Sequence, residues 1–126
     1  MSFDWTDYLQ FAEALALNPA LPGPEEAALR SAVSRAYYAA YCCARDLAAG
    51  RRELTPARLT SDHTLIIDHF RLDSDPARRQ IGTYLGRLRN NRNRADYDGT
   101  LRGAPAELAL SSVQLARDIL TDLSSL

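Results

Sequence analysis

The segment SDPARRQIGTYLGRLRNNRNRAD, residues 74–96, decides the fold class of this chain. Ser74-Asp75-Pro76 predicts a helix start, because a capping residue followed by proline is typical of a first turn. At about 100° per residue, one face of this helix collects the apolar side chains: Ile81, Tyr84, Leu85, Leu88 and Ala95. We therefore expect a long amphipathic helix that runs to about Asp96, with Gly99 just past its end.

The other strong periodicities in the chain are also helical. Helices are expected at about residues 4–17, 24–49, 62–72 and 105–123, and the polar stretch 50–62 is expected to be a loop. Pro24 is expected in the first turn of its helix. No segment alternates apolar and polar residues with period two over a useful length, so no sheet is predicted. The sequence therefore predicts one all-α domain that spans residues 1–126.

The helix at about residues 24–49 has two faces that other helices could cover. Its main apolar stripe consists of Leu29, Val33, Ala36, Tyr37, Ala40, Ala44, Leu47 and Ala48, and the other side carries Arg35, Tyr38 and Cys42. A helix with two such faces is often central in a bundle or lies at a dimer seam. We therefore expect a homodimer, with a core that includes Tyr37, Ala40, Ile81, Leu85 and Leu88.

Composition limits the possible partners. The net charge of −1 gives no overall attraction to nucleic acid or anionic membrane, so any polyanion site must be local. The adjacent Cys42 and Cys43 fit neither a disulfide framework nor a zinc site. The N-terminus shows no leader pattern, and no apolar run approaches the roughly 20 residues that span a bilayer. We expect a cytoplasmic protein with no metal, no cofactor and no membrane contact.

Arg92 is the anomaly in the helix at residues 74–96. It falls near the centre of the apolar stripe, four residues after Leu88, and Asp96 falls near the edge of that stripe. Arginine cannot lose its proton, so burying its charge without a partner is costly. Three outcomes are open: an internal pair with Asp96, a cleft or interface at this point, or an anionic ligand that supplies the missing charge.

The residues around Arg92 favour contact with phosphate. Residues 88–98 contain three arginines and three asparagines, although asparagine is a mediocre helix former. Both side chains are good donors to phosphate oxygens and base edges. A solvated helix end whose arginines complement the helix dipole is the alternative interpretation. The candidate site is Arg92, Asn93, Asp96 and Tyr97, with Arg87, Arg89, Arg94 and His63 as weaker candidates for RNA or nucleotide contact.

Two segments resemble prokaryotic HEPN-domain proteins. Ser34-Arg35-Ala36-Tyr37-Tyr38-Ala39-Ala40-Tyr41 is similar to the R-x-Y-Y-A-x-F segment of that family, and residues 88–98 are similar to its L-R-x-x-R-N-x-A-D-Y segment. Between them, the stretch that runs from Asp62 to Phe70 resembles a third family segment. Order and spacing match from about residue 24 to the end of the chain.

The resemblance implies a dimeric bundle of four main helices plus a short one. Many HEPN proteins are metal-independent ribonucleases of toxin–antitoxin, CRISPR or anti-phage systems, and others are inactive scaffolds or pair with a nucleotidyltransferase. Their nuclease motif is R-x4-6-H, with a polar residue after the arginine. Arg92 and Asn93 match its start, but Tyr97 and Asp98 stand where the histidine is expected. The motif is therefore degenerate.

The missing histidine bears on chemistry more than on fold. Metal-free RNA cleavage needs a base for the 2′-hydroxyl, an acid for the leaving 5′-oxygen and a cation for the phosphorane. Arg92 could supply the cation. General acid–base catalysis is worth roughly 10²–10⁴-fold, and a tyrosine hydroxyl is too weak an acid to replace histidine near neutral pH. His63 could take the role only if the fold brings it to Arg92.

Three functions are compatible with these residues. The first is a degenerate HEPN module that binds RNA, a nucleotide or an operon-encoded partner such as a nucleotidyltransferase, with Tyr97 as a possible target of adenylylation. The second is an active endoribonuclease toxin that uses Arg92. The third is a purely structural helical interaction protein in which Arg92 and Asp96 pair. The absent histidine favours the first over the second.

Overall fold

The computed structural model describes residues 2–21 and 23–126, and every regular element in that range is an α-helix. The elements are α1 (Thr6–Leu17), α2 (Glu25–Gly50), α3 (Asp62–Arg71), α4 (Pro76–Tyr97) and α5 (Pro105–Ser124). The predicted all-α class is confirmed, and each helix begins and ends within two residues of its expected position. Among the described residues, no helix combines the length and apolar character that crossing a bilayer requires.

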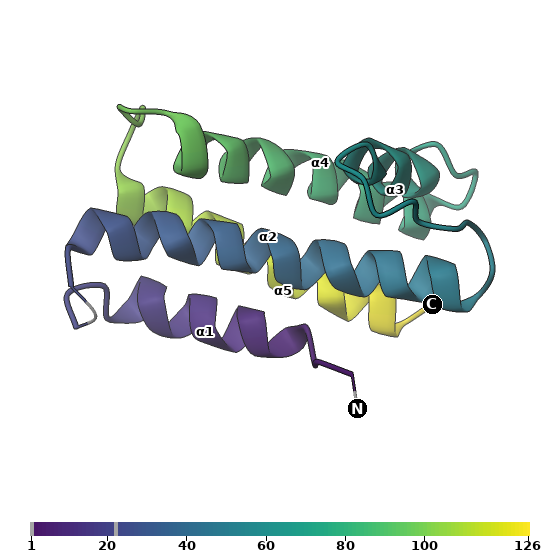
Figure 1. Ribbon diagram of the computed structural model, residues 1–126, viewed down its shortest axis with the longest axis horizontal. Coiled ribbons are helices and arrows are strands. Elements are labelled where there is room, and N and C mark those ends of the chain that lie inside the picture. The colour runs from purple at the N-terminus through teal and green to yellow at the C-terminus, as the bar shows by residue number, and fades with distance from the viewer. Residues whose placement is uncertain (1, 22) are drawn as a thin grey trace.

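The long helix α2 is the centre of the bundle. It packs against α1, α3, α4 and α5, and in Figure 1 it runs through the middle with α1 below it and α4 above. Its stripe of fully buried alanines allows these neighbours to approach closely: Ala32, Ala36, Ala39, Ala40, Ala44 and Ala48. The predicted core is confirmed, because Tyr37, Ala40, Ile81, Leu85 and Leu88 are all fully buried.

The short helix α3 lies against the first half of α4. A methyl group at Gly82 of α4 would come within 2.1 Å of the backbone nitrogen of Arg71, so only glycine fits at this crossing. Ile66 and Phe70 of α3 are fully buried in the same region. This close contact fixes the end of α3, at Arg71, relative to α4.

One helix end differs from the expectation, and another is capped in a way that the sequence did not indicate. Pro24 precedes α2 as its capping residue instead of standing in the first turn, since its ψ of 126° is extended. Gly99 lies just past the end of α4, as expected, but it is not among the glycines with positive φ and so provides no left-handed cap. The guanidinium of Arg30, on α2, caps that end instead by donating to the carbonyl oxygens of Ala95 at 3.0 Å and Asp98 at 2.6 Å. The segment that carries Arg92 is thereby tied to α2.

Candidate functional site

Arg92 occupies the core position that its helical phase predicts. It lies on α4 between the buried residues Leu88 and Ala95, and only 7% of its surface is exposed. A side chain buried to this extent has lost most of its hydration, so its charge must be compensated by the surrounding protein or by a ligand.

Compensation from the protein is incomplete. The nearest carboxylate is that of Asp96, one turn along α4, at 3.8 Å from Nη1 of Arg92. This distance is longer than a charge-assisted hydrogen bond, which spans about 2.7–2.9 Å. The Nε atom of Arg92 is buried and has no hydrogen-bond partner among the described residues. Asp96 itself accepts a bond of 3.3 Å from the Ser34 hydroxyl on α2.

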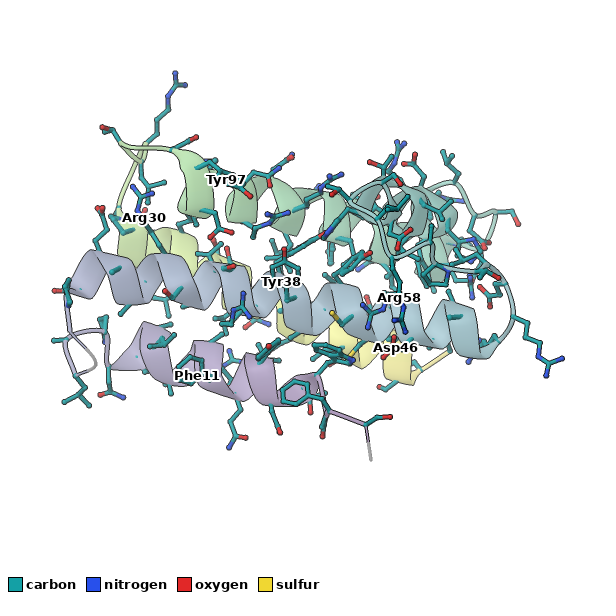
Figure 2. The ribbon with its side chains drawn as sticks, viewed as in Figure 1. Phe11, Arg30, Tyr38, Asp46, Arg58 and Tyr97 are labelled. Atoms are coloured by element: carbon teal, nitrogen blue, oxygen red, sulfur yellow. The ribbon has the colours of Figure 1, made fainter. Side chains whose placement is uncertain are left out.

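Aromatic faces provide the other contacts of the Arg92 guanidinium. Its central carbon lies 5.2 Å from the ring centroid of Tyr37, 5.5 Å from that of Tyr38 and 6.0 Å from that of Tyr97. Such cation–π contacts attract the charge but satisfy none of its N–H donors. In Figure 2, Tyr38 is labelled beside the middle of α2 and Tyr97 beside the last turns of α4. The site therefore holds an arginine whose hydrogen-bonding capacity is largely unused.

His63 joins this cluster from α3. Its Nδ1 atom lies 2.6 Å from the Tyr37 hydroxyl, and its ring stacks on Tyr41 with centroids 4.3 Å apart and an interplanar angle of 16°. Because Tyr37 also faces Arg92, one tyrosine contacts both the guanidinium and the imidazole. The fold thus brings together Arg92 and His63, which are far apart in the sequence.

The protonation states in the cluster follow from burial and charge. Burial raises the pKa of Tyr37 well above its ordinary value, so its hydroxyl keeps the proton and can donate it to Nδ1 of His63. Burial, followed by the charges of Arg89 and Arg92, lowers the pKa of His63 below its ordinary value of 6.5. His63 is therefore held neutral. With Nδ1 accepting from Tyr37, its Nε2 carries the hydrogen and is a donor.

Arg89 provides a second cation beside His63. Its Nη1 donates to the Thr64 hydroxyl at 3.1 Å, while its Nε is buried without a partner in the described part of the chain. Arg89, Arg92 and His63 together present N–H donors and no spare acceptor. Donor groups arranged in this way suit an acceptor-rich anion such as phosphate.

The remaining candidates divide between the edge of the cluster and other parts of the surface. Tyr97 is 75% exposed and covers Arg92 from outside. Asn93 is half-buried, with no hydrogen bond from its side chain to a described residue. Arg94 donates to the carbonyl of Arg102 at 2.9 Å and so holds the loop after α4. Arg87 is exposed and lies over the ring of Tyr84. Neither Arg87 nor Arg94 joins the cluster.

Sequence reasoning missed the contribution of α2. The residues that meet the α4 and α3 side chains are Ser34, Tyr37, Tyr38 and Tyr41, spaced by three or four positions. Residues with this spacing lie on one side of a helix. A polar and aromatic face on α2 was therefore the sequence pattern that could have predicted their role in the site. Arg30 carried no such signal, because the carbonyls that it caps belong to α4 and the residues after it.

A hollow of about 620 Å³ adjoins the cluster, with Tyr38 and His63 in its lining. It lies between α2 and residues 56–63, which include the end of the loop and the start of α3. The side chain of Asp62 shapes this loop by accepting bonds from the backbone nitrogens of Ala57 at 3.0 Å and Arg58 at 2.8 Å. No group of three or more His, Cys, Asp or Glu side chains in the described residues could hold a metal ion.

No protein-family model, no curated protein and no solved structure matches this chain. The HEPN resemblance therefore rests on the residues of the two segments and on their spacing. Those two segments contribute to one cluster in the structure, because Tyr37 and Tyr38 come from the first and Arg92, Asp96 and Tyr97 from the second.

Proposed function

We propose that this chain is a HEPN-like module of a toxin–antitoxin, CRISPR-associated or anti-phage system that binds phosphate groups of RNA or nucleotides through Arg92. The observation that carries the proposal is a nine-tenths buried arginine whose Nε has no partner among the described residues and whose nearest carboxylate is 3.8 Å away. A phosphate oxygen at the terminal nitrogens of Arg92 would supply a counter-charge and an acceptor that the protein does not provide.

Binding is favoured over rapid turnover. Tyr97 stands where the motif histidine is expected, and it is exposed at the edge of the cluster. The pKa of His63 is lowered, which favours its neutral form, and in the tautomer in which Nδ1 accepts from the Tyr37 hydroxyl, Nε2 carries the hydrogen. In that form His63 can donate a hydrogen bond to phosphate, but it has no free lone pair with which to accept a proton.

The test is RNA binding without metal, in the presence of a chelator. We expect Arg92→Ala to weaken binding strongly, while Arg87→Ala, an exposed arginine on the same helix, should leave affinity nearly unchanged. Affinity of the native chain should fall as salt is added, because phosphate contacts release counterions. An Arg92→Ala variant that binds RNA as well as the native chain but has lost a few kcal/mol of stability, as roughly expected for a broken buried pair, would reject the proposal in favour of a structural role.

Metal-independent ribonuclease activity is the second candidate, and the position of His63 favours it. Arg92 and His63 face the same tyrosine, so one phosphodiester could lie near both. The 2′-oxygen would attack phosphorus as its proton passes to Nε2. The bond to the 5′-oxygen would then break as that oxygen takes the proton back from Nε2, which leaves His63 neutral again. For this, the hydrogen of His63 must first move to Nδ1 and the Tyr37 hydroxyl must become the acceptor.

Product ends separate the two candidates. Cleavage by this route leaves a 2′,3′-cyclic phosphate, and His63→Gln should abolish it while keeping RNA bound. The loss expected for one acid–base group is roughly 10²–10⁴-fold. RNA that stays intact on the native chain, with binding that depends on Arg92, supports the binding module alone.

A second copy of the chain and an operon-encoded protein are the proposed partners. Two-fold association would bring two Arg92 segments together and concentrate positive charge locally, although the net charge per chain is −1. Light scattering should give a dimer mass, and a monomer mass across micromolar concentrations would contradict this. A nucleotidyltransferase is the partner class that the family resemblance suggests, and Tyr97 is exposed as a modification target must be.

A further inference from the structure

The hollow beside the Arg92 cluster has a defined set of walls. Helix α2 contributes Tyr38, Tyr41 and Arg45, the loop contributes Arg58, and α3 contributes His63. Tyr38, Asp46 and Arg58 are labelled along α2 on the face shown in Figure 2. At about 620 Å³ it falls within the roughly 300–1,000 Å³ of sites that hold small molecules.

Its acceptors are already engaged by the protein. The carboxylate of Asp46 accepts bonds from the indole of Trp5 and from Nε of Arg45, both at 2.9 Å. The carboxylate of Asp62 accepts the two backbone N–H bonds that shape the loop. The two negative charges in the lining are therefore satisfied before any ligand arrives.

Several donors in the lining remain free. Within the described residues, no acceptor meets the guanidinium of Arg58, the terminal nitrogens of Arg45 or the hydroxyls of Tyr38 and Tyr41. The imidazole of His63 is bonded only through Nδ1. A hollow whose remaining arginine donors are unpaired among the described residues, while its two carboxylates are already bonded, matches a ligand that is rich in acceptor oxygens and negatively charged.

The backbone at Arg58 holds its side chain at the hollow at a conformational cost. Its φ of 61° lies in the left-handed region, which residues with a Cβ seldom adopt. The bond from its nitrogen to Asp62 fixes that conformation. Strain of this kind persists where the surrounding structure imposes it, and it concentrates at ligand sites.

The same hollow also offers flat apolar surface. Tyr41 is buried and stacks on His63, so the accessible rings are those of His63 and Tyr38, which lie edge-on to each other with centroids 6.1 Å apart. Pro56 and Leu59 line the loop side. Any of the nucleic-acid bases can stack on such rings, because each base has a flat π-face. Flat surface and free cationic donors in one hollow fit the two halves of a nucleotide.

We propose that this hollow is a nucleotide-binding subsite, in which a base packs against the Tyr38 and His63 rings and a phosphate bonds to Arg58 and Arg45. The inference deepens the proposed function and rests on it: Tyr38 and His63 belong to both places, so an RNA phosphate near Arg92 would put an adjacent nucleotide in the hollow. The ligand class is thus single-stranded RNA with one unstacked base, or a free nucleotide.

Trp5 provides an intrinsic reporter for the test. It is the single tryptophan of the chain, its indole donates to Asp46 in the lining, and Arg45 lies 5.3 Å from its ring centroid. The experiment titrates the full chain with AMP, adenosine and inorganic phosphate, and follows Trp5 fluorescence and binding heat. AMP should bind more tightly than either half alone.

Arg58→Ala and Arg52→Ala form a matched pair. Both arginines lie in the same loop with left-handed φ, at 61° and 59°, but Arg52 is not part of the lining. Alanine keeps the Cβ in each case, so backbone strain is retained. Arg58→Ala should weaken AMP binding about tenfold, the effect of losing roughly one charge-assisted bond, whereas Arg52→Ala should match the native chain.

The outcomes separate this inference from the proposed function. If RNA binding depends on Arg92 but AMP gives neither heat nor a fluorescence change, the subsite is refuted and the proposed function stands. Equal AMP affinity in the Arg58 and Arg52 variants also refutes it. If AMP binding depends on Arg58 while Arg92→Ala leaves RNA binding unchanged, the hollow is a nucleotide site and the proposed role of Arg92 is wrong.

Discussion

Arg78 and Arg92 lie on the same helix, about four turns apart, and each stacks on an aromatic ring, yet they are paired in opposite ways. The guanidinium of Arg78 lies 4.8 Å from the centroid of Phe70, donates to Asp73 at 2.9 Å and bonds to Glu53. Arg92 lies 5.2 Å from the centroid of Tyr37, and the one carboxylate that pairs with it among the described residues is that of Asp96, at 3.8 Å.

This difference shows what a structural arginine looks like in this fold. At Arg78, two carboxylates complete the bonding and connect the loop after α2 to the start of α4. Glu53 also accepts from His69, so three elements meet there. The Arg92 guanidinium contacts tyrosine rings instead, and its Nε has no partner among the described residues. The side chain of Arg92 is nevertheless more buried than that of Arg78. A residue needed only for stability would be expected to resemble Arg78.

The largest effect on stability is expected at an apolar core position of α4. Leu85 is fully buried between the two arginines, and Leu85→Ala should cost roughly 2–5 kcal/mol of unfolding free energy through lost contacts and a cavity. Chemical denaturation measures this, with the half-exposed Leu110→Ala as control, for which about 0.5 kcal/mol or less is expected. An unchanged melting temperature in Leu85→Ala would show that the helical phase is wrong.

The fold and the burial of Arg92 were accessible to sequence reasoning for the same reason. Helical periodicity is a local signal, and the prolines at Pro76 and Pro105 mark helix starts directly. The phase that placed Leu85 and Leu88 in the core placed Arg92 beside them. The partners of Arg92 were less accessible, since Asp96 was the only candidate on the same helix.

The rest of the site depends on tertiary placement that no local pattern encodes. His63 reaches Tyr37 because α3 packs against both α2 and α4, and those contacts leave no periodic signature in the sequence. The hollow depends on the path of a polar loop, which the sequence marks only as a loop. The absence of a motif histidine could be read from the chain, but the presence of His63 in the cluster could not.

The second prediction compares Arg78→Met with Arg92→Met. Methionine keeps much of the side-chain volume but removes the charge. Arg78→Met should lose about 1 kcal/mol, because Glu53 and Asp73 lose their partner yet remain partly hydrated. Arg92→Met should stay within about 1 kcal/mol of the native chain or become more stable, because an apolar side chain suits a site where the charge is poorly compensated.

Denaturation of the two variants under one buffer condition measures the difference. If Arg92→Met is destabilised as much as Leu85→Ala, the Asp96 pair and the tyrosine contacts are sufficient to make Arg92 structural. Arg92 would then stabilise the fold as Arg78 does, despite the longer distance to its carboxylate partner. The proposed phosphate site would lose its main support.

The third prediction concerns acid stability at the Arg78 end. The bond from Arg78, followed by the bond from His69, lowers the pKa of Glu53 below its ordinary value of 4.5. A carboxyl with a lowered folded pKa contributes stability that is present above its ordinary pKa and lost as pH falls through the folded value. Melting temperature should therefore fall as pH drops below about 4.5, and Glu53→Gln should flatten that fall. If the melting temperature of Glu53→Gln falls with pH as it does in the native chain, the bonds from Arg78 and His69 to Glu53 add nothing to acid stability.

The smallest effect is a pKa shift at the Arg92 end. Burial is the main cause that lowers the pKa of His63, and the charges of Arg89 and Arg92 add to it. Titration by NMR should give a His63 pKa below 6.5 in the native chain. Arg92→Met should raise that pKa only in part, since burial and Arg89 remain, while Arg78→Met should leave it unchanged because Arg78 contacts His69 instead.

The same shift has a defined effect on stability. Because the folded pKa of His63 lies below the unfolded one, its neutral form contributes stability that is present above pH 6.5 and lost as pH falls through the folded value. His63→Gln should remove this part of the pH dependence, which lies above the range where Glu53 acts. A His63 pKa that is indifferent to Arg92→Met would mean that the guanidinium charge is already neutralised inside the protein, and the contrast with Arg78 would disappear.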